Sequence, residues 1–182
     1  QRIIERTPKA NTVLIATTGF TGRELFAIDD RSNHFYMVGS MGCASSLGLG
    51  VALARSDLKV VIIDGDGAGL MRMGNFATIG SYAGHNLIHI LLNNEVHDST
   101  GGQATVGGNV DFLKVAEASG YSVCLSSNEI DIIDKLFNIG PQDGPVFAHL
   151  RIASGTIGDL PRPDITPNKV LNRLMKHINS SF

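Results

Sequence analysis

The stretch VVIIDGDGAGLMRMGNF, residues 60–76, decides the fold. Its first part is an apolar run rich in β-branched residues with almost no polar alternation, a pattern typical of a central parallel strand that is covered on both faces. The run ends in Asp-Gly-Asp-Gly, and a pattern with helical spacing follows. The pattern therefore predicts a buried strand that turns into a helix, with the carboxylate of Asp66 at the turn between two glycines.

The same alternation of apolar runs and amphipathic segments extends along the chain and predicts an α/β fold, a doubly wound and mostly parallel sheet with helices on both faces. Pro167 at a first helical position and Asn128 and Thr166 as N-caps mark two of the helix starts. Without an internal repeat or a long linker, residues 1–182 are expected to form a single domain. Strands are predicted at 12–17, 34–38, 59–64, 87–92, 121–126 and 145–152, and helices at 22–28, 43–55, about 70–83, 110–120, 128–140 and from 167 onward.

The composition is that of a globular protein. The 182 residues are 43% hydrophobic and 18% charged with a net charge of -2, which gives no electrostatic reason to expect nucleic acid or an anionic membrane as a partner. Cys43 and Cys124 stand outside any CxxC motif and are expected to be reduced thiols of a cytoplasmic protein. The start of the chain does not resemble a signal peptide, and no segment approaches the roughly 20 apolar residues of a membrane span.

Polar side chains follow two predicted strands at the point where each ends. Asp66 comes after the strand at 59–64, and Asn93 and Asn94 come after the strand at 87–92. In open α/β sheets, ligands bind beyond the carboxyl ends of the strands, so the two groups face one crevice if the strands are neighbours. A carboxylate beside a diphosphate is repelled by several kcal/mol in a partly dry site.

A divalent cation removes this repulsion. Mg²⁺ takes oxygen ligands from carboxylates, amides and carbonyls, and we interpret Asp66, the Asn94 side chain and the carbonyl of Val96 as candidate metal ligands. A dinucleotide site is disfavoured, because Leu70 stands where the third glycine of that fingerprint belongs. The alternative left open is that the Asp-Gly and Asn-Asn pairs only shape turns.

These residues resemble the two-part motif of the thiamine diphosphate enzymes, which reads GDG at 65–67 and NN at 93–94 in this chain. The resemblance implies that Asp66, Asn94 and the main-chain oxygen of Val96 bind Mg²⁺, and through it the diphosphate of thiamine diphosphate. It also implies that the backbone around Gly65, at Gly67 and Ala68 in particular, contacts phosphate oxygens.

A second match lies upstream, in VGSMGCASSLGLGVALA at 38–54. By this resemblance Met41 wedges between the two rings of the cofactor, and the carbonyl of Gly39 accepts a hydrogen bond from its aminopyrimidine. ATTGFTGRELF at 16–26 is similar to the first strand-end loop of the family's domain and implies cofactor contacts at Thr18 and Gly19. Together the matches span the chain from about residue 12 to residue 150.

The family's activating glutamate belongs to a pyrimidine-binding domain. None of the five glutamates of this chain stands in a setting that matches that role. The resemblance therefore implies that a separate pyrimidine-binding subunit supplies the glutamate, that the active site lies between chains of a hetero-oligomer, and that this chain alone is inactive.

Within the family, NNEVHDSTGGQ at 93–103 looks most like phosphonopyruvate decarboxylase and sulfopyruvate decarboxylase. The resemblance implies a lyase that converts phosphonopyruvate to phosphonoacetaldehyde and CO2, with sulfopyruvate as the alternative substrate. Ser99, Thr100 and the N–H groups of Gly101 and Gly102 are predicted to form a nest for the substrate anion. His97 is the candidate catalytic residue, as a donor to that anion or a proton shuttle. The alternative is that His97 and the residue after it only stabilise the loop.

Two further functions stay open at this point. One is a subunit of acetolactate synthase or of an oxoacid oxidoreductase, although the latter usually carries cysteine clusters for iron–sulfur centres, which this chain lacks. The other is a non-catalytic nucleotide-binding α/β module, which would retain its ligand without Mg²⁺.

Overall fold

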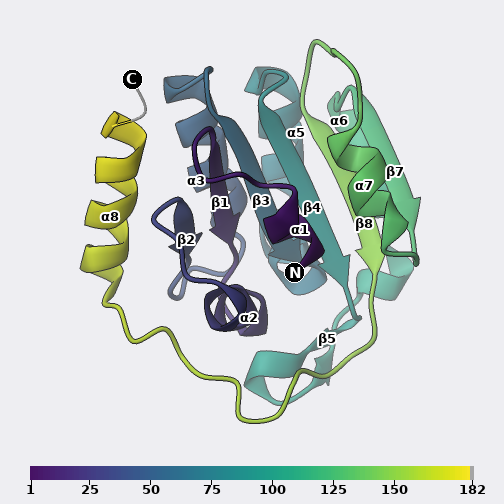
Figure 1. Cartoon of the computed structure of the whole chain (residues 1–182). Helices are drawn as coiled ribbons and strands as arrows, with labels where there is room; N and C mark the ends of the chain where they lie inside the picture. Colours follow the sequence, from purple (N-terminus) through teal and green to yellow (C-terminus); the bar gives the residue numbers. More distant parts are fainter. Residues whose placement is uncertain (181–182) are drawn as a thin grey trace.

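Six parallel strands form the main sheet of the computed structural model, which describes residues 1–180 (Figure 1). Their order across the sheet is β2-β1-β3-β4-β8-β7. The two central strands, β3 and β4, are direct neighbours, with Gly65 opposite Leu92. The strands are β1 (Thr12–Ala16), β2 (His34–Tyr36), β3 (Lys59–Gly65), β4 (Leu87–Asn93), β7 (Val123–Ser127) and β8 (Val146–Arg151).

Helices cover both faces of this sheet (Figure 1). Val60 and Ile62 of β3 face one core with α3, α5 and α6, whereas Val61 and Ile63 face the other with α1, α2 and α7. Both faces of β3 are buried, which is why its sequence shows no polar alternation. The predicted doubly wound α/β fold is confirmed. The helices are α1 (Arg2–Glu5), α2 (Phe20–Ile28), α3 (Ala44–Ala54), α5 (Gly74–Tyr82), α6 (Phe112–Ser119), α7 (Asp131–Phe137) and α8 (Pro167–Ser180).

The single helix predicted at about 70–83 is wrong. A short helix α4 (Asp66–Met71) begins directly at the motif, the backbone leaves helical geometry at Arg72, and α5 starts afresh at Gly74. The early start is allowed by small residues, because a Cβ at Gly69 would lie 2.7 Å from Cδ1 of Leu91. Glycine there lets α4 pack closely on β4.

The polar segment between β4 and α6, residues 94–111, has its own local structure. An antiparallel hairpin of β5 (Val96–His97) and β6 (Gln103–Ala104) encloses the 3₁₀ turn η1 (Asp98–Thr100), and a second 3₁₀ turn, η2 (Gly107–Asn109), follows. The N–H of Thr105 donates to the carbonyl of Glu95 at 2.8 Å, which closes the hairpin. This folding returns residues 105–107 to the end of β3.

The helix predicted at 128–140 needs correction at both ends. Asn128 is not an N-cap, because α7 begins at Asp131 after Ile130, and the chain ahead of it turns with the hydroxyl of Ser127 accepting from the N–H of Glu129 at 2.9 Å. The helix also ends at Phe137, before the predicted stop at 140. Helix α1 was not predicted, because four residues are too few for a periodic signal.

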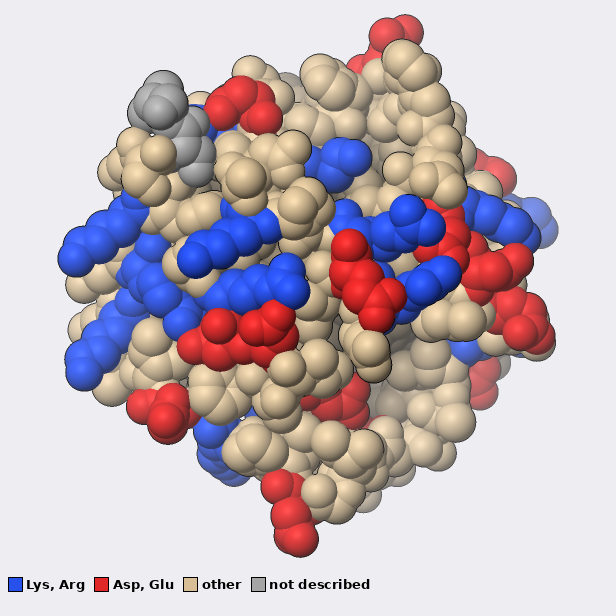
Figure 2. All heavy atoms as spheres, in the orientation of Figure 1, with Lys and Arg blue, Asp and Glu red and all other residues tan. Residues whose placement is uncertain are grey.

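Basic side chains gather over α8, on the left of the space-filling view (Figure 2). Lys9, Lys169, Arg173 and Lys176 line a groove there. Arg173 is paired with Asp30 through contacts of 2.6 and 2.7 Å. Within residues 1–180, no helix has the length and hydrophobicity needed to cross a bilayer.

Candidate active site

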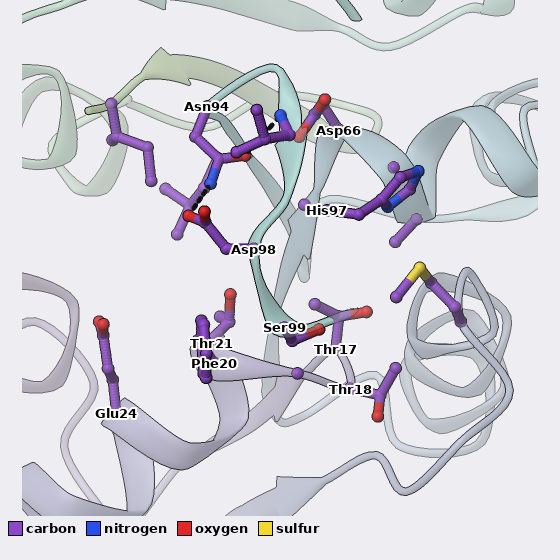
Figure 3. Close-up of a pocket in the computed structure, with 18 of the residues that line it drawn as sticks. Thr17, Thr18, Phe20, Thr21, Glu24, Asp66, Asn94, His97, Asp98 and Ser99 are labelled. Atoms are coloured by element: carbon purple, nitrogen blue, oxygen red, sulfur yellow. Dashed lines mark hydrogen bonds between the residues drawn. The ribbon is translucent and has the colours of Figure 1, made fainter. Parts of the chain in front are cut away.

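A cavity of about 110 Å³ lies beyond the carboxyl ends of β1, β3 and β4, and we call it the β3–β4 cavity (Figure 3). Nine of the ten predicted cofactor-binding residues line it, namely Thr18, Gly19, Met41, Gly65, Asp66, Gly67, Ala68, Asn94 and Val96. Gly39 does not line this cavity, so its predicted carbonyl contact stays a prediction. The residues come together because β3 and β4 pair in parallel and end at the same edge.

Asp66 is a buried carboxylate without a cationic partner. It is only 2% exposed, and no lysine or arginine within residues 1–180 forms an ion pair with it. The hydroxyl of Thr105 donates to its Oδ2, and the N–H of Gly107 donates to the same hydroxyl oxygen at 3.0 Å. A buried charge is costly unless it is paired or coordinates a metal, so this site fits a cation.

The amide of Asn94 is oriented by Asp98. Its Nδ2 donates to Oδ2 of Asp98 at 2.7 Å, and because a carboxylate only accepts, the nitrogen has to face that side. The opposite edge of the amide presents Oδ1, which accepts the N–H of Val96 at 3.3 Å. Figure 3 shows Asn94 and Asp66 at the same end of the cavity. The two side chains among the three predicted metal ligands therefore offer oxygen atoms at neighbouring strand ends.

Asp98 has a second connection, to the segment after β8. Its Oδ2 also accepts the N–H of Gly155 at 2.7 Å, and the hydroxyl of Thr156 donates to Glu24 at 2.6 Å. The segment that leaves β8 is thus tied to both walls of the β3–β4 cavity.

His97 lies over the backbone at the start of α4. A Cβ at Gly67 would be 2.4 Å from its Cε1 and 2.7 Å from its Nδ1, so only glycine at 67 leaves room for the imidazole. The ring borders the cavity at the backbone predicted to contact phosphate.

The predicted anion nest is only partly assembled. Ser99 lines the β3–β4 cavity, and Thr100 lines a neighbouring one that shares Met41. Gly101 and Gly102 line neither of these two cavities, because they make the turn of the β5–β6 hairpin at φ of 123° and 73°. The N–H of Gly102 donates to the carbonyl of His97 at 3.0 Å and is not available to an anion.

A second polar network supports the end of β4 from the interior. The side-chain amide of Asn93 contacts Nε2 of His149 at 3.1 Å, while its oxygen accepts the N–H of Glu95 at 3.1 Å. Ser126 holds the other ring nitrogen of His149 at 3.1 Å, and burial lowers the pKa of this histidine. The network shapes the turn that presents Asn94.

His89 lies in the core and is buried. Its two ring nitrogens are 3.3 Å from Asp64 and 3.0 Å from the hydroxyl of Tyr121, and burial raises the pKa of that tyrosine. The group packs among Phe76 and Phe147.

Sequence reasoning missed Thr105 as a residue that holds the site. It named Asn93 only as part of the NN pair and Asp98 only as a residue that stabilises the loop, so their contacts with His149 and Asn94 were not predicted. The signal that was present is the unusual length of the polar loop after β4, since long loops in compact domains are often functional. Their partners lie up to 57 positions away in the sequence, and no local pattern identifies such pairs.

Residues 18–150 match the family model of the thiamine pyrophosphate enzymes, C-terminal TPP-binding domain. A phosphonopyruvate decarboxylase of Streptomyces viridochromogenes is 43% identical over 99% of this chain and 45% of its own length. The sulfopyruvate decarboxylase subunit beta of Methanothermobacter thermautotrophicus is 38% identical over 93% of this chain and 88% of its own.

Solved structures show the same fold. A putative thiamin diphosphate-dependent enzyme from Mycobacterium smegmatis superimposes with a TM-score of 0.68 at 18% identity, over 85% of this chain and 31% of that one. The chain spans less than half the length of the two phosphonopyruvate decarboxylases it matches, at 45% and 43%.

Proposed function

The chain belongs to the thiamine pyrophosphate enzymes, as their C-terminal cofactor-binding domain, and on this premise we propose that it is the diphosphate-binding part of a decarboxylase. Its proposed substrate is a three-carbon 2-keto acid with a second anionic group, phosphonopyruvate in the first place. The products are then phosphonoacetaldehyde and CO2. The nucleotide-binding alternative is set aside, because the family membership extends over most of the chain.

The observation that carries the proposal is the buried carboxylate of Asp66 beside the amide oxygen of Asn94. We propose that these two groups and the carbonyl of Val96 hold Mg²⁺, and that the backbone at Gly67 and Ala68 binds the diphosphate. When bound, thiamine diphosphate supplies the electron sink that decarboxylation of a 2-keto acid needs. The residues of this chain hold the diphosphate end in place and keep water from it.

His97 is the proposed catalytic residue. Its ring borders the cavity and packs on Gly67. A ring nitrogen is therefore available to hold or donate a proton at the anionic group of the substrate. The hydroxyl of Ser99 lies on the same wall and is proposed to bind the substrate.

We further propose that the activating glutamate comes from a separate pyrimidine-binding subunit. A cavity of about 110 Å³ is smaller than the few hundred Å³ that a site for a whole cofactor-sized ligand occupies. The relative named as a beta subunit is matched over 88% of its length, which supports a divided enzyme. The same relative is the reason to retain sulfopyruvate as the second candidate substrate.

The test is reconstitution. The chain is co-expressed with the pyrimidine-binding subunit, and CO2 release is measured from phosphonopyruvate, sulfopyruvate and pyruvate side by side. We expect release to require both subunits, thiamine diphosphate and Mg²⁺, and to be fastest with phosphonopyruvate. A complex that binds the cofactor but releases no CO2 from any of the three would refute the proposed reaction.

A further inference from the structure

We propose that Arg162 binds the second anionic group of the substrate, in a cavity that adjoins the β3–β4 cavity. This inference rests on the proposed function and extends it to substrate selection. The guanidinium group would distinguish a keto acid with a phosphonate or sulfonate from one that carries only its carboxylate.

The second cavity has a volume of about 440 Å³, and we call it the Arg162 cavity. It shares the walls formed by Thr18, Gly19, Met41 and Ser99 with the β3–β4 cavity. A three-carbon substrate that reacts next to Met41 therefore has a second compartment within reach of its far end.

The two cavities differ in charge. Three carboxylates, those of Glu24, Asp66 and Asp98, line the β3–β4 cavity, and among residues 1–180 it has no lysine or arginine. The Arg162 cavity is lined by Arg23 and Arg162 and, over the same residues, by no acidic side chain. Like charges repel strongly in a partly dry site, so a second anionic group is directed to the arginine side.

Arg23 is already engaged with the protein. Its Nε donates to the carbonyl of Pro161 at 3.2 Å, it also donates to the carbonyl of Leu160, and its guanidinium lies 5.2 Å from the ring centroid of Phe20. Arg162, in contrast, has no hydrogen bond or ion pair within the part of the chain that the structure describes. Arg23 thus holds the backbone at Leu160 and Pro161, whereas the N–H groups of Arg162 are available to bind a ligand.

The backbone that carries Arg162 is well anchored. Residues 152–166 cross the carboxyl edge of the sheet between β8 and α8 (Figure 1). Leu160 is only 5% exposed. The first half of this segment is held by the hydrogen bonds of Gly155 to Asp98 and of Thr156 to Glu24. Prolines at 161 and 163 restrict the backbone on both sides of Arg162, which lowers the entropy cost of presenting it.

The chemistry of the group suits the ligand. A guanidinium donates two parallel N–H bonds to oxygens of a phosphonate or sulfonate, whereas a lysine acts only as a point charge. The hydroxyl of Thr100 lies on the wall of the same cavity but donates to the carbonyl of His97 at 3.3 Å, which leaves Arg162 as the donor for the anionic group. Loss of the two parallel N–H donors of the guanidinium group is therefore expected to reduce the selectivity for dianionic keto acids.

The experiment compares Arg162→Met, Arg162→Lys and the control Lys169→Met in the complex with the pyrimidine-binding subunit. Lys169 is an exposed cation that lines the groove over α8 and lines neither the β3–β4 cavity nor the Arg162 cavity. We expect Arg162→Met to lower kcat/KM for phosphonopyruvate by about 30-fold or more, mostly through KM, and that for pyruvate by less than about threefold. Arg162→Lys should retain part of the selectivity, and the control should retain all of it.

An equilibrium measurement covers the case in which turnover is too slow to compare. Thermal stabilisation of the holo complex by 3-phosphonopropionate should exceed that by propionate in the wild type and the control, and the difference should disappear in Arg162→Met. Equal effects of Arg162→Met on phosphonopyruvate and pyruvate, or none on either, would overturn the inference while decarboxylation by the wild type upholds the proposed function. A wild-type complex that decarboxylates none of the keto acids would overturn both.

Discussion

Replacement of Asp66 by asparagine is expected to abolish most of the stability that the assembled protein gains from thiamine diphosphate and Mg²⁺. Without these ligands the variant should be as stable as the wild type or more so, because a buried carboxylate with no cationic partner is costly. Asparagine keeps the shape and still offers an oxygen to the hydroxyl of Thr105.

The magnitude follows from ligand linkage. At a cofactor concentration 100 times its Kd, the wild type gains about 2.7 kcal/mol in unfolding free energy. For a domain of this size, that gain raises Tm by about 5–10 °C. If loss of the carboxylate ligand weakens binding about 100-fold, the gain at the same concentration falls to about 0.4 kcal/mol, or about 1–2 °C.

The assay is thermal unfolding of the complex with and without thiamine diphosphate, over a titration of Mg²⁺. Asp143→Asn, which changes an exposed loop carboxylate away from the cavities, is the matched control. The reasoning would be refuted if the Asp66 variant kept its ligand-induced shift and needed no more Mg²⁺ than the control for half of it.

The remaining predictions concern the support of the site and the core. Gly67→Ala puts a carbon 2.4 Å from the imidazole of His97 and should weaken cofactor binding by about tenfold, measured by titration, whereas Gly50→Ala, with no atom within 4 Å of the new Cβ, should not. Thr105→Val removes the donor to a buried carboxylate and should lower the urea unfolding free energy by about 1.5–3 kcal/mol, whereas Thr105→Ser should lose little; equal stability of the two variants would contradict this. Burial lowers the pKa of His34 from 6.5 to about 4, so the unfolded chain takes up its proton first as pH falls. Stability should therefore decline from about pH 6.5 to about pH 4, with a contribution of at most about 1.4 kcal/mol per pH unit that His34→Phe removes in urea titrations at several pH values.

The fold was largely predictable because its central strands carry an unusual signal. The apolar run before Asp66 is buried on both faces, and burial on both faces is what removes polar alternation. The break at Arg72 was not predictable, because periodicity continues through it while the packing of α4 on β4 determines where the helix stops.

The site was predictable at the strand ends and less so around them. Asp66 and Asn94 each follow a strand directly, so the order of the strands was the one missing fact, and the pairing of β3 with β4 supplies it. The contact of Thr105 with Asp66 spans 39 positions and depends on how the β5–β6 hairpin folds back. The use of the Gly102 N–H inside that hairpin likewise depends on tertiary geometry.

The most direct test of the account is to locate the cation. Crystals of the complex grown with thiamine diphosphate and Mn²⁺ in place of Mg²⁺ would give an anomalous signal from the metal. We predict a single peak between the carboxylate of Asp66 and the side-chain oxygen of Asn94, in contact with the diphosphate. A bound diphosphate with the metal elsewhere, or with these two side chains turned away from it, would contradict the central claim.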